Sequence, residues 1–193
     1  MTESARPSLT IPVDDRDHAL GPSNASVVVV NYGDYQCADC RERHRQVQKL
    51  IDALAKRVRF VYRHFPLINV HPEALRASEA AEAAGAQGKF WEMHRLLYTS
   101  PNKLKDRDLH SHAKAIGLDI DRFDREMAES VYASQILKDY YRAINCGVSG
   151  APTTFINGEL YAMSGVELLT VVQNILADSQ TTQNQTFTSS SGS

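Results

Sequence analysis

The feature that constrains this chain most is a run of four valines that leads, through a short polar turn, to two cysteines. The valines occupy residues 27–30, and Cys37 and Cys40 stand at the start of an amphipathic helical pattern. The β-branched run predicts a central strand covered on both faces. A helix N-terminus favours negative charge, so it favours the thiolate over the thiol. The i, i+3 spacing places both sulfurs on one helix face, close enough to form a disulfide.

This arrangement predicts redox chemistry, with Cys37 as the nucleophile and Cys40 as its resolving partner. A structural zinc site is the main alternative, but it needs four ligands, usually from two such pairs. The third cysteine, Cys146, has no second cysteine or close histidine beside it, so we predict no metal site. Cys146 is interpreted as a small buried apolar residue. A role for Cys146 as a second redox thiol stays open, because it precedes Pro152 by six residues and could lie within reach of the cysteine pair.

Composition narrows the class of protein. A length of 193 residues suits a single domain. A net charge of −2 and a pI near 6.4 do not favour a nucleic-acid partner. No segment approaches the ~20 apolar residues of a membrane span, so we expect no membrane insertion. Residues 1–20 lack the apolar core of a signal peptide, which makes the cytoplasm the expected location. In that compartment a close cysteine pair is more often catalytic or metal-binding than structural.

Hydrophobic periodicity predicts an α/β frame interrupted by helices. A strand at 26–32, a helix at 37–56 and a strand at 58–64 form a βαβ unit with parallel strands. Residues 72–145 read as helical throughout. The frame resumes with a strand at 153–156, an Asn157-Gly158 hairpin turn, a returning strand at 160–163 and a helix at 165–177. We therefore predict a flexible arm at 1–20, one domain at 21–178 and a disordered polar tail at 179–193.

These motifs, in this order, resemble the DsbA-type branch of the thioredoxin superfamily. The resemblance rests on the Cys37–Cys40 pair after a strand, on the helical insertion and on residues 147–158 (GVSGAPTTFING). Residues 63–67 (RHFPL) and 88–94 (GKFWEMH) resemble in particular the thioredoxin-like domains of this branch that occur alone or fused to sodium/proton antiporters. It covers about residues 17–178.

The resemblance implies a thioredoxin fold whose helical insertion caps the active site. It also implies a thiol–disulfide oxidoreductase that needs no cofactor beyond the dithiol. Pro152 is then cis and, with Ala151, lines a substrate groove opposite the cysteine pair. An extended substrate segment could pair with the backbone exposed there. The implied partners are substrate proteins or small thiols and disulfides, together with a redox partner that supplies or removes electrons.

The two residues between the cysteines depart from the pattern of this branch. It often has proline after the first cysteine and histidine, tyrosine or tryptophan before the second, whereas this chain has Ala38 and Asp39. At ~6 Å and an effective dielectric of 20 to 40, Asp39 would oppose the Cys37 thiolate by about 1–3 kcal/mol. We therefore expect a site less oxidising than DsbA, closer to thioredoxin, and a potential near about −120 mV would contradict this.

Other assignments stay open at this stage. Asp34 is interpreted as a loop residue that bonds nearby backbone N–H groups, or as a carboxylate that assists proton transfer from Cys40. The direction of electron flow is open between reductase or isomerase activity and oxidase activity. The alternative functions are a kappa-type glutathione transferase or isomerase, against which the intact cysteine pair counts, and a non-redox peptide-binding or chaperone module.

Overall fold

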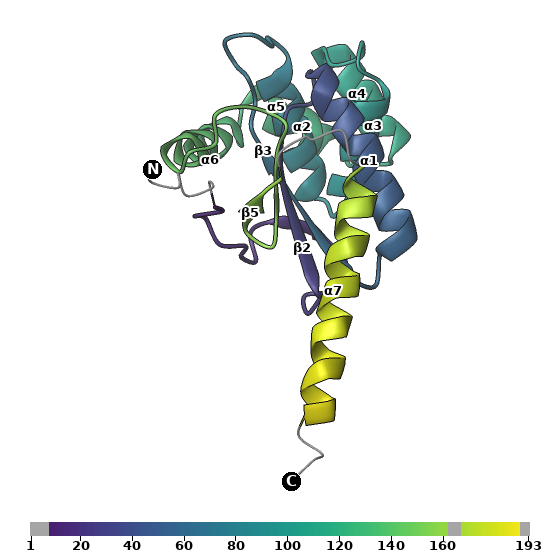
Figure 1. Cartoon of the computed structure of the whole chain (residues 1–193). Helices are drawn as coiled ribbons and strands as arrows, with labels where there is room; N and C mark the ends of the chain where they lie inside the picture. Colours follow the sequence, from purple (N-terminus) through teal and green to yellow (C-terminus); the bar gives the residue numbers. More distant parts are fainter. Residues whose placement is uncertain (1–7, 162–166, 190–193) are drawn as a thin grey trace.

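The computed structural model describes residues 8–161 and 167–189 and shows one mixed sheet with helices on both faces (Figure 1). The strands are β1 (His18–Leu20), β2 (Val27–Gly33), β3 (Val58–His64), β4 (Thr153–Ile156) and β5 (Glu159–Leu160). Their order across the sheet is β1-β3-β2-β4-β5, so β2 lies at the centre. The valine run therefore forms the central strand, as predicted.

The helix that follows the cysteines connects two parallel strands. α1 (Ala38–Leu54) crosses from β2 to β3, which pair in parallel from Val27 opposite Val58 to Gly33 opposite His64. This confirms the predicted βαβ unit. β4 pairs antiparallel with the other edge of β2, and the Asn157-Gly158 turn returns the chain into β5. The carboxyl ends of β2 and β3 thus deliver the cysteine turn and His64 to the same end of the sheet.

Residues 72–145 contain five helices and no strand. They are α2 (Ala74–Gly85), α3 (Phe90–Thr99), α4 (Asp106–Ala115), α5 (Ile120–Ala128) and α6 (Ala133–Asn145). Alanines fill most of the buried face of α2, and their small side chains let α3, α5 and α6 pack closely around it. The all-helical insertion into an α/β frame is confirmed.

Two clusters of buried side chains hold the layers together. On one face of the sheet, α1, α3 and α7 (Leu168–Ser189) cover β2 and β3, with Val29, Phe60 and Leu168 in the shared core. On the other face, α6 contributes Tyr140 and Ala143 to a smaller cluster. Figure 1 shows α6 on the opposite side of the sheet from α1 and α7. The sheet is covered on both faces, which is why β2 begins with four valines and has no exposed residue.

The prediction of a flexible arm up to residue 20 is wrong for the described residues 8–20. His18–Leu20 form an edge strand paired with β3, and Ser8 forms a bridge with Glu159. Asp17 binds the guanidinium of Arg63 on β3 at 2.7 Å, and both side chains are largely buried. A three-residue strand is too short to show a period, and the pairing of Asp17 with Arg63 depends on a residue 46 positions away.

The predicted disordered tail is wrong for residues 179–189, because α7 continues to Ser189. The helix begins on buried Leu168, Val172 and Leu176. Once a helix is anchored, each added residue gains a backbone hydrogen bond at little further nucleation cost, so a polar sequence can extend it. The predicted strand at 160–163 is observed only as Glu159–Leu160, and residues 162–166 and 190–193 lie outside the described part. Among the described helices, none is both long enough and apolar enough to cross a membrane.

Candidate active site

The two cysteines occupy the first turn of α1. Cys37 is the N-cap residue in extended conformation, and α1 begins at Ala38. The backbone N–H of Cys37 donates to the carbonyl of Asp34 at 3.3 Å, which closes the turn that follows β2. Cys37 is 8% exposed and Cys40 only 1% exposed, and both are free thiols. Of the two sulfurs, only that of Cys37 is therefore accessible to a substrate.

The two thiols have very different acidities. The pKa of Cys37 falls to about 6, first because the side chain of Cys40 donates a hydrogen bond to it and then because the backbone N–H groups of Cys40 and Asp39 stabilise the thiolate. Burial and the charge of Asp34 oppose this effect. The pKa of Cys40 is raised, mainly by the same hydrogen bond to Cys37 and by burial. At neutral pH Cys37 is therefore mainly a thiolate, and Cys40 is a thiol that donates a hydrogen bond to it. This ionisation pattern is typical of a nucleophile and its resolving partner.

The buried carboxylate beside this pair belongs to Asp34, which has no exposed surface. Its Oδ1 accepts from the N–H of Gln36 at 2.7 Å, and its Oδ2 accepts from the N–H of Leu67 at 2.8 Å. Nδ1 of His71 lies 2.9 Å from the same Oδ2. The link from Asp34 to Cys40 runs through the backbone, whose N–H donates to Sγ of Cys40 at 3.4 Å. The carboxylate thus joins the cysteine turn to the loop at 65–73.

The charge that opposes the Cys37 thiolate comes from Asp34 rather than from Asp39, the residue expected to repel it. Asp39 is exposed, and its backbone N–H lowers the pKa of Cys37, while the carboxylate that raises this pKa is Asp34. Water screens an exposed charge, so its repulsion of the thiolate is well below the value expected for a partly buried pair. Ala38 is likewise exposed and leaves the surface next to Cys37 free of a large side chain.

Two basic residues on α1 near the cysteines, Arg43 and His44, are buried. Burial lowers the pKa of His44 to about 4, so its imidazole is neutral at pH 7 and supplies no positive charge to the thiolate. Arg43 is 2% exposed, and its guanidinium lies 4.9 Å from the centre of the Tyr161 ring. The thiolate of Cys37 therefore depends on hydrogen bonds and the helix N-terminus rather than on an adjacent imidazolium.

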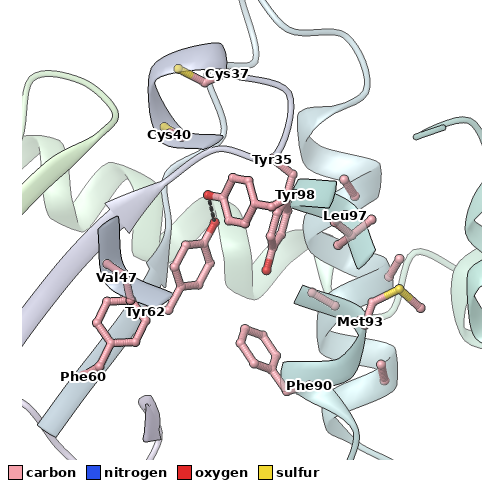
Figure 2. Packing of buried hydrophobic residues seen from close by; sticks show 14 of the residues in the cluster. Tyr35, Cys37, Cys40, Val47, Phe60, Tyr62, Phe90, Met93, Leu97 and Tyr98 are labelled. Atoms are coloured by element: carbon pink, nitrogen blue, oxygen red, sulfur yellow. Dashed lines mark hydrogen bonds between the residues drawn. The ribbon is translucent and has the colours of Figure 1, made fainter. Parts of the chain in front are cut away.

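A layer of aromatic side chains supports the cysteine pair from within the core (Figure 2). Tyr62 on β3 and Tyr98 on α3 are joined through their hydroxyls at 3.1 Å, and the hydroxyl of Tyr35 lies 3.0 Å from Nδ1 of His94. A Cβ at Gly33 would come within 2.7 Å of both Tyr62 and Tyr98, so only glycine fits there. The layer joins residues from three separate segments of the chain, so no single motif in the sequence predicts it. The alternation along β3 and the i, i+4 spacing of His94 and Tyr98 were its only signals.

One of the two residues predicted to line a groove, Ala151, lies next to the nucleophile. Sγ of Cys37 lies 3.6 Å from the carbonyl oxygen of Ala151, although the two residues are 114 positions apart. The Ala151–Pro152 peptide bond is cis, and both residues are partly exposed. Cys146 is the C-cap residue of α6, and it is a partly exposed free thiol rather than the buried residue predicted.

The acidity of Cys37 predicts a pH profile. In the reduced protein, alkylation of Cys37 by iodoacetamide should follow a single titration with its midpoint near the pKa of about 6. Because this pKa lies below the unfolded value of about 8.5, ionisation of Cys37 stabilises the reduced fold fully above that pH, and the stabilisation is lost as the pH falls through about 6. Peptide mapping by mass spectrometry separates Cys37 from Cys146.

The Cys40→Ala variant tests the cause of this shift. It removes the thiol whose hydrogen bond is the largest contribution, so the midpoint should rise towards the value of a free cysteine. A midpoint near 8.5 in the parent protein, or an unchanged midpoint in Cys40→Ala, would contradict the assignment.

A mixed five-stranded sheet with a CxxC pair at the start of the helix after its central strand, and with an all-helical insertion, defines the DsbA-like thioredoxin class. A family model described as thioredoxin matches residues 14–174, and the chain belongs to this family. Both the fold class and the resemblance stated from the sequence are confirmed.

Curated relatives include much longer proteins. The chain is 46% identical over 151 residues to the Na⁺/H⁺ antiporter NhaA 1 of Salinispora arenicola, a match that covers 78% of this chain and 23% of the relative. It is 36% identical over 153 residues to the Na⁺/H⁺ antiporter NhaA of Nitrosospira multiformis, covering 78% of this chain and 24% of that one. The chain therefore spans about a quarter of the length of the curated relatives it matches.

Solved structures point to one fold. A thioredoxin-like oxidoreductase from Silicibacter pomeroyi is 28% identical, with a TM-score of 0.73 and coverage of 87% of this chain and 94% of that one. The thiol-disulfide exchange protein alpha-DsbA2 from Wolbachia pipientis gives a TM-score of 0.70 at 21% identity, covering 84% and 87%. At that lower identity the likeness shows the fold alone. The fold and these neighbours support a thiol–disulfide oxidoreductase in general terms.

Proposed function

We propose that the protein catalyses thiol–disulfide exchange through the Cys37–Cys40 pair, with the covalent intermediate on Cys37. The observation that carries the proposal is the pairing of an accessible thiol whose pKa is about 6 with a buried thiol whose pKa is raised. The carbonyl of Ala151, 3.6 Å from Sγ of Cys37, marks the wall of the groove that would hold an extended substrate segment.

The reaction proceeds in two exchanges. The Cys37 thiolate attacks one sulfur of a substrate disulfide, forms a mixed disulfide and releases the other sulfur as a thiolate. Cys40 then gives its proton to the released substrate thiolate or to water, and its sulfur attacks Sγ of Cys37. This releases the second substrate sulfur as a thiolate, which takes up a proton from water, and leaves the Cys37–Cys40 disulfide. Two electrons pass from the protein to the substrate. Each step is reversible, so the same residues can oxidise a substrate dithiol.

The structure supports a reason for the order of these steps. The largest contribution to the raised pKa of Cys40 is its hydrogen bond to Cys37. Once Cys37 is in a mixed disulfide it no longer carries a negative charge, so Cys40 loses the partner that held its proton. Its pKa then falls, and the resolving thiolate forms only after a substrate is bound. Burial still raises the pKa of Cys40 at this stage, so the loss of the Cys37 thiolate lowers this pKa only in part.

The direction of electron flow depends on the reduction potential. Reported thiol pKa values are about 7 in thioredoxin and about 3.5 in DsbA, and the value of about 6 for Cys37 lies between them. We propose a potential closer to that of thioredoxin, a cytoplasmic location, and reductase or isomerase activity towards protein or small-molecule disulfides. A redox partner would return the pair to the dithiol state, and the chemistry needs no cofactor beyond the two cysteines.

Equilibration with glutathione tests the proposal. The fraction of Cys37–Cys40 disulfide, measured by trapping the free thiols at a series of ratios of reduced to oxidised glutathione, should follow a two-electron curve. We expect a potential between about −230 and −270 mV, the range from glutaredoxin to thioredoxin. A potential near about −120 mV would reverse the proposed direction. Failure of the pair to form a reversible disulfide would overturn the function itself.

The Asp39→His variant tests the spacer residue. Removing an exposed negative charge near Cys37 favours the thiolate slightly, which stabilises the reduced form. An exposed pair contributes at most about 1 kcal/mol, so the potential should become more oxidising by about 10–20 mV. The matched control is Asp52→His, an exposed aspartate further along α1, which should leave the potential unchanged. A shift to a more reducing potential in Asp39→His would contradict this account.

A further inference from the structure

Three titratable side chains that the exchange mechanism does not use meet on another part of the fold. They are His18 on β1, His64 at the end of β3 and Glu82 on α2, and one ligand atom from each lies within 4.8 Å of the others. Nε2 of His18 and Nε2 of His64 each lie 2.9 Å from the same oxygen, Oε1 of Glu82. Two imidazole nitrogens and one carboxylate oxygen thus converge on a single point.

We propose that His18, His64 and Glu82 form a binding site for a divalent transition-metal ion, with Zn²⁺ as the representative. Imidazole ligands favour zinc and its first-row neighbours, whereas calcium and magnesium take oxygen ligands. Ligand atoms of tetrahedral zinc, each about 2.0–2.1 Å from the metal, lie about 3.3 Å apart. The present spacing of 2.9 Å between Nε2 and Oε1 therefore needs to widen by only a fraction of an ångström.

The two imidazole rings are held in place by packing. The ring of His18 stacks on Phe90 with centroids 3.5 Å apart and planes 7° apart. The ring of His64 meets Tyr62 edge-on at 89°. Gly85, one turn after Glu82 on α2, makes room for His18, because a Cβ there would come within 3.3 Å of its Cε1. A site whose ligands are already oriented loses little conformational entropy when the ion binds.

The protonation of His64 also permits coordination. Its Nδ1 is buried and has no hydrogen-bond partner among the residues that the structure describes. A neighbouring group that donated a hydrogen bond to Nδ1 would keep the imidazole proton on Nε2. None of the described residues supplies such a donor. Nε2 can therefore coordinate a metal ion as part of a neutral imidazole whose hydrogen is on Nδ1, and any proton displaced from Nε2 passes to water.

The cluster has an entry path and room for a fourth ligand. All three side chains line a cavity of about 240 Å³ between β1, β3 and α6. Three aspartates and three arginines also line the cavity. Together with Glu82 this gives four carboxylates against three guanidinium groups, so the charge of the lining does not repel a cation. A zinc ion held by three protein ligands has a fourth position open. Here that position would face the cavity, where water or a small ligand can bind.

Bound metal would join three separate elements of the chain. It would connect the edge strand β1, the end of β3 and the helical insertion through α2, close to the aromatic layer under Cys40, where the rings of Tyr35 and His64 have centroids 5.8 Å apart. The sequence predicted no metal site, because the ligands are 46 and 18 residues apart and none stands in a recognisable spacing. The proposal does not depend on the redox function.

Zinc titration of a cysteine-free, untagged full-length chain tests the proposal. Replacing Cys37, Cys40 and Cys146 with serine removes every thiolate that could bind the metal. After treatment with a chelator, isothermal titration with ZnCl₂ should show one ion per chain. The Glu82→Gln and His18→Gln variants should each weaken binding by at least about tenfold, since each loses one of three ligands. The matched control is His110→Gln, because His110 forms an exposed pair with Asp124 at 2.8 Å and should not affect binding.

Two further measurements separate loss of the ligand from loss of the fold. Circular dichroism of the chelated variants should match the parent, and zinc should raise the melting temperature of the parent but not of His18→Gln. Co²⁺ should give visible absorption bands in the parent that are weaker in both variants. If Glu82→Gln fails to fold, His18→Gln decides, because His18 lies at the sheet edge. Absence of stoichiometric binding, or binding unchanged in both variants, would overturn the site.

Discussion

Replacing Cys37 with serine should reduce the rate of insulin reduction, with dithiothreitol as the electron donor, to the rate without protein. A serine hydroxyl is not ionised at neutral pH, and the sulfur that forms the mixed disulfide is gone. The Cys40→Ser variant should keep the first exchange and lose the second. Mixed with a stoichiometric amount of a peptide disulfide and no other thiol, it should accumulate a covalent adduct on Cys37, visible by mass spectrometry and reversed by dithiothreitol.

The matched control is Cys146→Ser. Cys146 is a partly exposed free thiol at the end of α6, and no step of the mechanism uses it. Its replacement should leave the insulin assay unchanged. Full activity in Cys37→Ser would exclude the proposed nucleophile. Loss of activity in Cys146→Ser alone would show that the third cysteine takes part, which the present mechanism does not allow.

Among the substitutions proposed outside the cysteines, Asp34→Asn should lower the free energy of unfolding the most. The asparagine keeps one acceptor oxygen but places an NH₂ group where the carboxylate accepts from Leu67 N–H or from Gln36 N–H. At least one buried N–H then faces another donor. We expect a loss of about 2–4 kcal/mol in the free energy of unfolding, measured by urea denaturation.

The same variant should also change the acidity of the nucleophile. The charge of Asp34 raises the pKa of Cys37 and of Cys40, so its removal should move the alkylation midpoint of Cys37 below the parent value of about 6. The control is Asp39→Asn, which removes an exposed carboxylate from the same turn and should change stability by less than about 0.5 kcal/mol. An unchanged stability or a raised midpoint in Asp34→Asn would show that this carboxylate does not hold the turn.

The order of secondary structure was largely predictable because its signals are local. Four consecutive valines, the amphipathic pattern of α1 and the Asn157-Gly158 turn each act over a few residues. The errors fell where local signals are weak. A three-residue edge strand has no measurable period, and the polar end of α7 extends a helix whose anchor lies earlier in the chain. Asp34 and Asp39 look alike in the sequence, and only burial distinguishes their roles.

The sequence by itself determined which residues the proposed chemistry uses: two cysteines at the start of a helix, within a βαβ unit that an all-helical insertion follows. Those features depend on neighbours within a turn or a strand. The tertiary structure decided which groups surround the sulfurs and which lie together elsewhere. It places Ala151 beside Cys37, and it brings His18, His64 and Glu82 to one point. Such contacts join residues far apart in the chain, and they arise only when sheet pairing and helix packing bring their elements together.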